Sequence, residues 1–479
     1  MAVKRLSTRR QRWRYVACDY ATSVFAFFIF NVCRFYLLAD DASSGFLPGE
    51  GCREFLLSQK LILEQIFIPV GMLGIYWLSG YYNLPFGKSR LQELITTFFS
   101  ALVNAALIYL LLLINDGTGR RVINYELILT LIGSLFLIPY LGRIVITSLA
   151  NARFRKHNWE FRTLIVGNTA EARATGRRLS DARSRMVVRI VGYLAVPGEQ
   201  SAADGERVFP LEDVEEVCRR EEIDQLVIAG SLSNESWVLT LLFRLFHLDI
   251  PIKIAPGTLS YVTSAIRLQD IYGEPYVDLT APVISESSKN MKRTMDVAIS
   301  VLVLLLLSPL FLFIAVIIKA DSRGPVIYSQ ERIGLRQRSF RIFKFRSMRV
   351  DAESDGPALS EENDPRITRV GRWMRKYRVD ELPQFWNVLK GEMSIVGPRP
   401  ERRYFIDRIM RKAPYYTLVY QVRPGITSWG MVKYGYARNV EEMVERTRYD
   451  LIYMSNMSLF VDMKILIYTV KTIFTGKGM

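Results

Sequence analysis

Four long apolar segments near the N-terminus most strongly constrain how this chain can fold. They are residues 15–38, 61–82, 94–114 and 127–150. Each is close to the ~20 residues that an α-helix needs to cross the hydrocarbon core of a bilayer. We therefore expect a four-helix transmembrane bundle over residues 1–150. The isolated polar residues in these segments, more typical of helix contacts than of a transport path, are Asp19, Asn31, Arg34, Glu64, Asn104 and Arg143.

The charges that flank the apolar segments predict their orientation. Basic residues are concentrated before the first segment and follow the fourth, whereas the first connecting loop is acidic. Lys and Arg are enriched on the cytoplasmic side of membrane proteins, so we expect the N-terminus and everything after about residue 151 in the cytoplasm. No small-residue cleavage site follows the first segment, which favours an uncleaved anchor over a signal peptide.

Residues 151–285 alternate strand-like and helix-like stretches, which predicts a Rossmann-like parallel α/β domain. The strand-like runs are 161–168, 189–196, 224–230 and 251–256. Of the G-x-G-x-x-G pattern that a dinucleotide site would carry after the first strand, only Gly167 is present. The sequence therefore favours a structural or regulatory domain over a nicotinamide site.

A fifth apolar run, residues 297–318, is interrupted by Ser308-Pro309. Proline removes a backbone donor and clashes with the preceding turn, so we expect a kink there. Basic residues flank the run on both sides, and a full crossing would place the basic remainder of the chain outside. A re-entrant helix that returns to the cytoplasmic face removes this conflict. An ordinary Pro-kinked span is the alternative.

Residues 286–479 carry most of the positive charge of the chain, whose formal net charge is +16. Such an excess suits nucleic acid, anionic lipid or phosphorylated small molecules, or it is a solvated basic face. Both histidines, His157 and His247, lie outside this region, so its chemistry must depend on carboxylates, lysine or a metal ion. Four cysteines without close pairing indicate neither a zinc site nor a disulfide framework.

One acidic pair, Asp380-Glu381, directly follows a run of arginines in this basic region. Arginines and a divalent cation neutralise a pyrophosphate, and adjacent carboxylates can hold Mg²⁺ together with phosphate oxygens. An aspartate can also attack phosphorus and split one difficult transfer into two easier steps. The plain alternative for the pair is a helix cap.

An ordered series of motifs surrounds this pair. They are Lys-Arg-x-x-Asp (Lys292, Arg293, Asp296), GPVIYSQERIG (324–334), FKFRSM (343–348), DPRITRVGRWMRK (364–376), VDELPQFWNVLKGEMSIVGPRPE (379–401) and VRPGITSWG (422–430). With them, the chain from about Lys289 to its C-terminus resembles the bacterial sugar transferase family, the polyprenyl-phosphate hexose-1-phosphate transferases. The four helices and the α/β domain resemble those of the large members, which make carriers for exopolysaccharide, capsule or O-antigen.

The resemblance implies a reaction and a role for each motif. A hexose-1-phosphate passes from a UDP-sugar to polyprenyl (undecaprenyl) phosphate, UMP is released, and Asp380 is the nucleophile that holds the phosphosugar. Glu381 assists, and the pair binds Mg²⁺. The implied phosphate-binding residues are Lys344, Arg346, Arg375 and Arg399. The residues implied for the re-entrant helix are Lys292, Arg293, Asp296, Ser308 and Pro309. Outward charges on a strand are the alternative for Lys344 and Arg346, and a surface loop charge is the alternative for Arg399.

The expected fold is thus membrane α plus α/β: four transmembrane helices, a cytoplasmic Rossmann-like domain without a dinucleotide loop, and an α-rich catalytic domain over 286–479. The resemblance favours UDP-glucose or UDP-galactose as donor, the cytoplasmic face of a bacterial inner membrane as location, and no nucleic-acid partner. It leaves open a monomer or a homodimer. One loop departs from the family: R-P-G-I-T-G-x-x-Q-V is common there, whereas Thr427 precedes Ser428-Trp429-Gly430 here. A non-catalytic scaffold and a nicotinamide-dependent enzyme are the rival functions.

Overall fold

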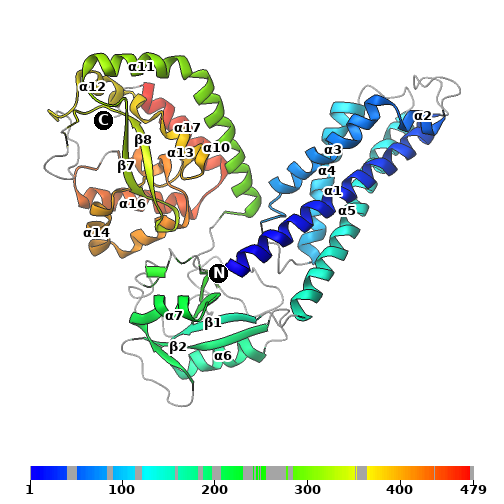
Figure 1. Ribbon diagram of the computed structural model, residues 1–479, viewed down its shortest axis with the longest axis horizontal. Coiled ribbons are helices and arrows are strands. Elements are labelled where there is room, and N and C mark those ends of the chain that lie inside the picture. Colours follow the sequence, from blue (N-terminus) through cyan, green and yellow to red (C-terminus); the bar gives the residue numbers. More distant parts are fainter. Residues whose placement is uncertain are drawn as a thin grey trace. The chain divides into compact units, whose positions relative to one another are not determined.

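The chain, shown as a computed structural model in Figure 1, divides into two units. The first comprises Met1–Trp159 with Ser285–Met291, and the second comprises Glu160–Ile284 with Lys292–Met479. The residues that the structure describes are 2–39, 51–83, 90–113, 121–156, 160–181, 187–196, 206–229, 241, 244–245, 248, 250–254, 277–278, 284–350, 352, 364–435 and 437–474.

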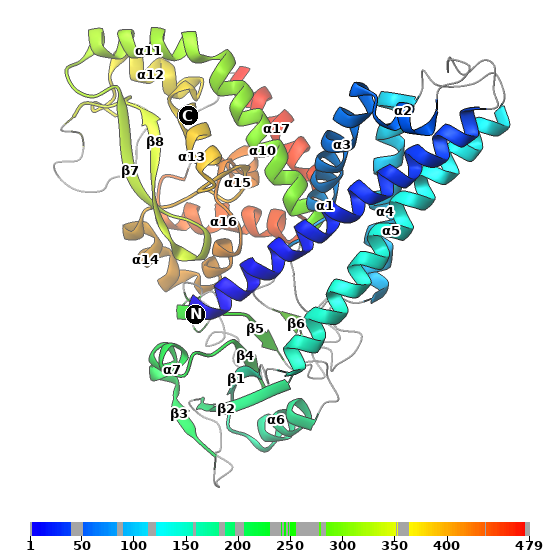
Figure 2. The ribbon, with the colours of Figure 1, turned by 45° about the vertical axis from the view of Figure 1, so that its right-hand side comes forward.

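The first unit contains the predicted apolar helices. They are α1 (Ala2–Ala39), α3 (Gln59–Leu78), α4 (Arg90–Ile108) with the π-helical turn η1 (Tyr109–Leu113), and α5 (Arg121–Lys156); the short α2 (Cys52–Leu56) lies between α1 and α3. Among the described residues, these four helices are each long and apolar enough to span a membrane. Figures 1 and 2 show α1 and α5 side by side along most of their length. The prediction of four apolar N-terminal helices is confirmed.

Two charged residues of the apolar segments pair with each other inside this bundle. The Arg143 guanidinium on α5 is fully buried and donates to both carboxylate oxygens of Asp19 on α1, at 2.9 and 2.8 Å. It also lies over the rings of Tyr76 and Tyr81, 4.2 and 3.8 Å from their centroids. Because a buried charge is tolerated only when it is paired, this pair joins α1 to α5.

The second unit begins with a sheet in the order β3-β2-β1-β4-β5-β6. Its strands are β1 (Glu160–Val166), β2 (Val187–Ala195), β3 (Val208–Pro210), β4 (Gln225–Ile228), β5 (Ile252–Ile254) and β6 (Val277–Asp278), with helices α6 (Ala170–Asp181) and α7 (Val214–Arg220). Five strands are parallel, which confirms a parallel α/β arrangement, but β6 runs antiparallel to β5. The sequence pattern missed β3 and β6, because strands of three and two residues show no alternation.

The C-terminal part of the second unit holds the motifs. Its helices are α10 (Glu286–Leu306), α11 (Ser308–Asp321), α12 (Arg369–Lys376), α13 (Gln384–Lys390), α14 (Arg403–Lys412), α15 (Trp429–Lys433), α16 (Val440–Ser455) and α17 (Leu459–Phe474). An antiparallel hairpin, β7 (Ile327–Ile333) and β8 (Ser339–Phe345), and a parallel pair, β9 (Ser394–Val396) and β10 (Gly425–Thr427), complete it. Figure 2 shows α12 lying along α11, beside the ends of β7 and β8.

The fifth apolar run forms two helices that meet at an angle. Helices α10 and α11 are bent by 61° at the break between Leu306 and Ser308. The Ser308 hydroxyl donates to the carbonyl of Leu305 at 2.8 Å, and Pro309 occupies the first turn of α11, where its missing N–H leaves no bond unmade. The kink therefore lies where the sequence predicts it. Helix α10 begins at Glu286, before the apolar run, in a polar segment whose Lys292, Arg293 and Asp296 contact other parts of the chain, and α11 ends at Asp321, just after the run.

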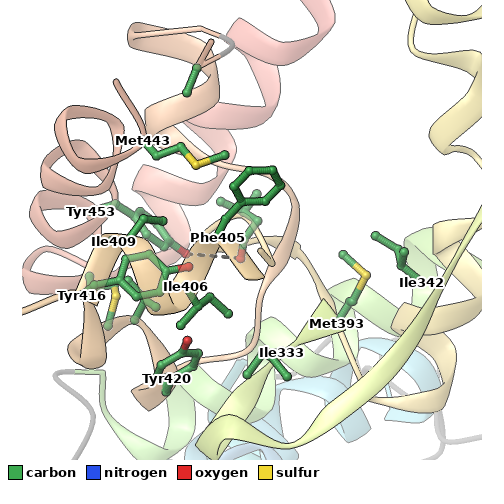
Figure 3. Close-up of a cluster of buried hydrophobic side chains, with 14 of the residues drawn as sticks. Ile333, Ile342, Met393, Phe405, Ile406, Ile409, Tyr416, Tyr420, Met443 and Tyr453 are labelled. Carbon is green, nitrogen blue, oxygen red and sulfur yellow. Dashed lines mark hydrogen bonds between the residues drawn. The ribbon is translucent and has the colours of Figure 1, made fainter. Parts of the chain in front are cut away.

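A large apolar cluster underlies this part of the chain (Figure 3). It contains Ile333 and Ile342 from the β7–β8 hairpin, and Met393, which directly precedes β9. Phe405, Ile406 and Ile409 from α14, Tyr416 and Tyr420, and Met443 and Tyr453 from α16 complete it. The cluster joins both two-stranded sheets to α14 and α16. The loops that follow β8 and β9 therefore start from a tightly packed core.

Candidate active site

The acidic pair lies in a tight turn between two helices. Arg378 follows α12 with a left-handed backbone (φ 54°), and the 3₁₀ turn η6 (Val379–Glu381) then leads into α13. Side chains on either side of the pair, Val379 and Leu382, pack into an apolar cluster with Met374 and Phe345. The turn is thereby held so that the carboxylates of both acids are buried.

Glu381 is surrounded by three cations from different positions along the chain. Its carboxylate accepts a hydrogen bond from Lys344 of β8 at 2.8 Å, and it lies 3.7 Å from Arg399 and 3.8 Å from Arg378. Burial acts to raise the pKa of Glu381, but the charges of Lys344, Arg399 and Arg378 outweigh it and hold the pKa below its usual range. Lys344 and Arg399 thus point inward to the acidic pair.

Asp380 differs sharply from its neighbour. Its side chain is 94% buried (6% exposed), yet no hydrogen bond or ion pair joins it to another residue in the described part of the chain. Burial raises the pKa of Asp380, the positive charge of Lys344 acts in the opposite direction, and the charge of Glu381 raises it further. No side-chain cap bond uses either acid at the start of α13. The site therefore contains one carboxylate that is paired with cations, Glu381, and one that has no partner in the described part of the chain, Asp380.

Arg375 joins this group from α12. Its Nε donates to the Ser347 hydroxyl at 2.9 Å, and its charge lowers the pKa of Asp380. The helix comes close to Ser347 because residue 371 is glycine: a Cβ there would lie 1.9 Å from the Ser347 carbonyl oxygen. Of the predicted phosphate-binding residues, the structure thus brings Lys344, Arg375 and Arg399 to the acidic pair.

Arg346 lies elsewhere. Its guanidinium donates to the backbone carbonyls of Arg323 and Ser322, at 2.5 and 2.7 Å, and to the Ser322 hydroxyl at 3.0 Å. These groups belong to the end of α11, where carbonyls lack helical partners. In the structure, Arg346 therefore connects the end of β8 to the end of α11. Its contact with phosphate stays a prediction.

Replacing Arg346 by alanine separates these two roles. We expect a loss of about 1–3 kcal/mol in unfolding free energy, since the partly buried carbonyls of Ser322 and Arg323 lose their donor, and an unchanged KM for the nucleotide sugar. Thermal unfolding in detergent and donor kinetics would measure both. A normal melting temperature with a raised KM would instead show that Arg346 binds phosphate.

The Lys-Arg-x-x-Asp motif anchors α10 to the surrounding chain. Lys292 pairs with Asp462 of α17 at 2.5 Å, and Arg293 donates to the carbonyls of Val388 and Leu389 at the end of α13. Asp296 accepts from Ser394 at 2.7 Å and from the Ile395 amide at 3.1 Å. These three residues hold the bent pair of helices to α13, β9 and α17.

Asp450 of α16 was not singled out by the sequence patterns, yet it organises the site. It accepts a hydrogen bond from the Gly430 amide at 2.8 Å, and the Ser428 hydroxyl and the Arg399 backbone amide also bond to it. Burial raises the pKa of Asp450 to about 6, against these hydrogen bonds and the charge of Arg446. Its helical spacing from Arg446, which pairs with Glu401 at 2.5 Å, is the signal that could have revealed it.

Changing Asp450 to alanine should therefore displace Arg399 without removing it. We expect kcat to fall by about tenfold, which corresponds to ~1.4 kcal/mol, because the Arg399 and Gly430 amides lose their acceptor. Asp450→Asn keeps an acceptor oxygen and should restore most of kcat. Steady-state kinetics of the two variants would test this, and equal losses in both would contradict it.

The acidic pair fits a magnesium ion that is held jointly with a substrate. Among the described residues no group of three His, Cys, Asp or Glu side chains could hold a metal by itself. Mg²⁺, however, is commonly bound by one or two carboxylates plus substrate phosphates. The partner-free Asp380 carboxylate next to Glu381 supplies this donor set.

Comparison with known proteins places this site in a family. A family model described as bacterial sugar transferase matches residues 287–476, which contain every residue of the site. A Caulobacter vibrioides protein named UDP-glucose:undecaprenyl-phosphate glucose-1-phosphate transferase is 40% identical over 186 residues, which cover 38% of this chain and 70% of that protein. The chain belongs to the bacterial sugar transferase family.

Two further relatives of this chain carry other sugars in their names. An Aeromonas hydrophila UDP-N-acetylgalactosamine-undecaprenyl-phosphate N-acetylgalactosaminephosphotransferase is 47% identical over 188 residues, 39% of this chain; the chain spans about half of its length, 44%. An Erwinia amylovora UDP-galactose-lipid carrier transferase is 29% identical over 464 residues, 90% of this chain and 91% of that protein. A second family model, described as CoA-binding domain, matches residues 78–256.

Proposed function

We propose that this chain transfers a hexose-1-phosphate from a UDP-sugar to undecaprenyl phosphate, through a phosphosugar bound covalently to Asp380. The observation that carries the proposal is the Asp380 carboxylate, which is buried, has no partner among the described residues and lies among the charges of Lys344, Arg375 and Arg378. A buried carboxylate without a partner is unfavourable, and a bound Mg²⁺ ion, or the phosphorus of the sugar phosphate in the covalent adduct, would supply one. The undecaprenyl-phosphate acceptor in the names of two relatives supports the same reaction.

The first step is a displacement at the sugar-proximal phosphorus. An oxygen of Asp380 forms a bond to this phosphorus, the bond from it to the bridging oxygen breaks, and UMP leaves with that oxygen and the electron pair. Lys344, Arg375 and Arg399 carry the charges that oppose the negative charge of the phosphates in the transition state. Their fixed positions favour this charge without reorganising the site.

The second step reverses the first with a different acceptor. An oxygen of undecaprenyl phosphate attacks the same phosphorus, and the bond to Asp380 breaks, which restores the carboxylate. The product is a polyprenyl-diphosphate-sugar. Mg²⁺, held by Asp380 and Glu381 with the substrate phosphates, would add charge neutralisation for the leaving group.

We also propose the location of the reaction. A re-entrant α10–α11 pair would keep the basic C-terminal part on the cytoplasmic side, which the charge distribution favours, and UDP-sugars are cytoplasmic. The reaction would then take place at the inner face of the bacterial inner membrane, as the first membrane step of exopolysaccharide, capsule or O-antigen synthesis.

A donor panel tests the function. Purified protein would be incubated with undecaprenyl phosphate, Mg²⁺ and UDP-glucose, UDP-galactose or UDP-N-acetylgalactosamine, and UMP would be measured. We expect UMP release with at least one donor, with UDP-glucose or UDP-galactose preferred. No release with any UDP-sugar, under conditions where the protein remains folded, would favour a non-catalytic scaffold.

A further inference from the structure

A mostly apolar pocket lies between α11 and α12, outside the acidic pair. It encloses about 400 Å³, within the range of ligand pockets. Residues Leu310, Phe313 and Ile317 of α11 and Val370, Trp373 and Met374 of α12 line it. Figures 1 and 2 both show the two helices side by side.

The walls of this pocket are suited to a hydrocarbon environment. Phe313 and Trp373 are 64% and 51% exposed, and the neighbouring Leu312 and Val316 on α11 are exposed as well. Helix α11 belongs to the bent pair that is apolar enough for a membrane. A contiguous exposed apolar surface of this kind indicates contact with lipid or with an apolar ligand.

The floor of the pocket is continuous with the back of the acidic turn. Ile314 and Met374, the two buried lining residues, belong to the same apolar cluster as Val379 and Leu382, which flank Asp380-Glu381. The pocket therefore shares its buried lining residues with the cluster that holds the acidic turn.

Helix α12 carries both apolar and basic side chains, as the binding of an amphiphile with a phosphate head would require. Its apolar residues Val370, Trp373 and Met374 face the pocket. Arg369 lies at the pocket, and Arg375, six residues further along the same helix, acts on Asp380. A ligand with an apolar tail and an anionic head thus matches the helix along its length.

We propose that this pocket binds the first isoprene units of the polyprenyl acceptor, next to its phosphate. The proposal rests on the function proposed above and adds the place where the lipid chain is held. The aromatic rings of Phe313 and Trp373 would contact the branched, unsaturated chain, and the arginines of α12 would direct the phosphate toward Asp380. A polyprenyl chain is chosen over a bilayer acyl chain because the proposed second step needs a phosphomonoester next to Asp380, whereas phosphatidylethanolamine and phosphatidylglycerol carry only phosphodiesters.

Acceptor kinetics test the proposal. The double variant Phe313→Ala/Trp373→Ala is compared with Leu312→Ala/Val316→Ala, which removes exposed apolar side chains of α11 that do not line the pocket. We expect the first variant to raise the KM for undecaprenyl phosphate by about tenfold, with an unchanged KM for the UDP-sugar, and the second to change neither. UMP released from the UDP-sugar alone, without acceptor, reports that the first variant is folded. An acceptor KM equal in both variants, with this release intact, would overturn the pocket; absence of the release in the unmodified protein would instead overturn the proposed function.

Photocrosslinking identifies the occupant directly. A polyprenyl phosphate with a diazirine in its first isoprene units should label α11 or α12 of the full-length protein in vesicles of phosphatidylethanolamine and phosphatidylglycerol. Excess undecaprenyl phosphate should suppress the label, and excess phospholipid should not. Suppression by phospholipid would show that a bilayer acyl chain occupies the pocket, and labelling confined to other segments would contradict the assignment.

Discussion

Asp380→Asn is expected to lower the rate of sugar-phosphate transfer by a factor on the order of 10⁴ or more, as losses of covalent nucleophiles do. The amide keeps the size of the side chain but cannot form the phosphosugar bond. Because the buried, partner-free charge of Asp380 is removed, the variant should remain folded and should be no less stable. UMP production and thermal unfolding would be measured together.

The adduct itself gives a sharper result. Incubation with a UDP-sugar in the absence of acceptor should add the mass of one sugar phosphate to the peptide that contains Asp380, and the Asn variant should lack this adduct. Asp407→Asn is a suitable control, since Asp407 is an exposed acid on α14, paired only with Arg403 at 3.4 Å in the described structure. An adduct on any other peptide would disprove the nucleophile assignment.

Lys344→Met should have the second largest effect. The lysine is the nearest cation to Glu381, and removal of one electrostatic donor from a preorganised site typically lowers kcat by roughly 10²–10³-fold. Lys412→Met, which changes an exposed lysine of α14, should leave kcat unchanged. A loss of similar size in both variants would indicate a general effect of net charge.

The same substitution should move the pH dependence in a defined direction. The Lys344 charge lowers the pKa of Asp380, and the Glu381 charge raises it. The proposed attack requires an ionised Asp380, so we expect the rate of UMP release to rise with pH through this pKa. The acid limb should shift to higher pH in Lys344→Met and to lower pH in Glu381→Gln. Single-turnover UMP release from pH 5 to 8 would show the shifts, and a common direction in both variants would contradict this assignment.

Local patterns predicted the four apolar N-terminal helices and the kink at Ser308-Pro309 well, because each depends on a short stretch of sequence. An apolar run of about 20 residues needs no tertiary information, and neither does a Ser-Pro break. The parallel strands were found for the same reason, whereas β3 and β6 were too short to show a period. The antiparallel direction of β6 depends on the path of the chain between strands, which local residues do not encode.

The roles of individual cations were harder to predict. Lys344 and Arg346 are two residues apart on one motif, yet Lys344 reaches Glu381 and Arg346 reaches the end of α11. Lys344 lies in β8 and Arg346 follows its end, and the partners that each one meets come from distant parts of the chain. Only the fold determines which partners these are. Asp450 was missed for the same reason, because its hydrogen bond with the Arg399 amide joins residues that are far apart in the sequence.

The left-handed backbone of Arg378 places stability and activity in opposition. A non-glycine residue in that region costs about 1–2 kcal/mol, and glycine would remove the strain. Glycine would also remove the guanidinium that lies 3.8 Å from Glu381. Selection of heat-resistant mutants without an assay for turnover would therefore enrich Arg378→Gly, and the more durable enzyme would be the slower one.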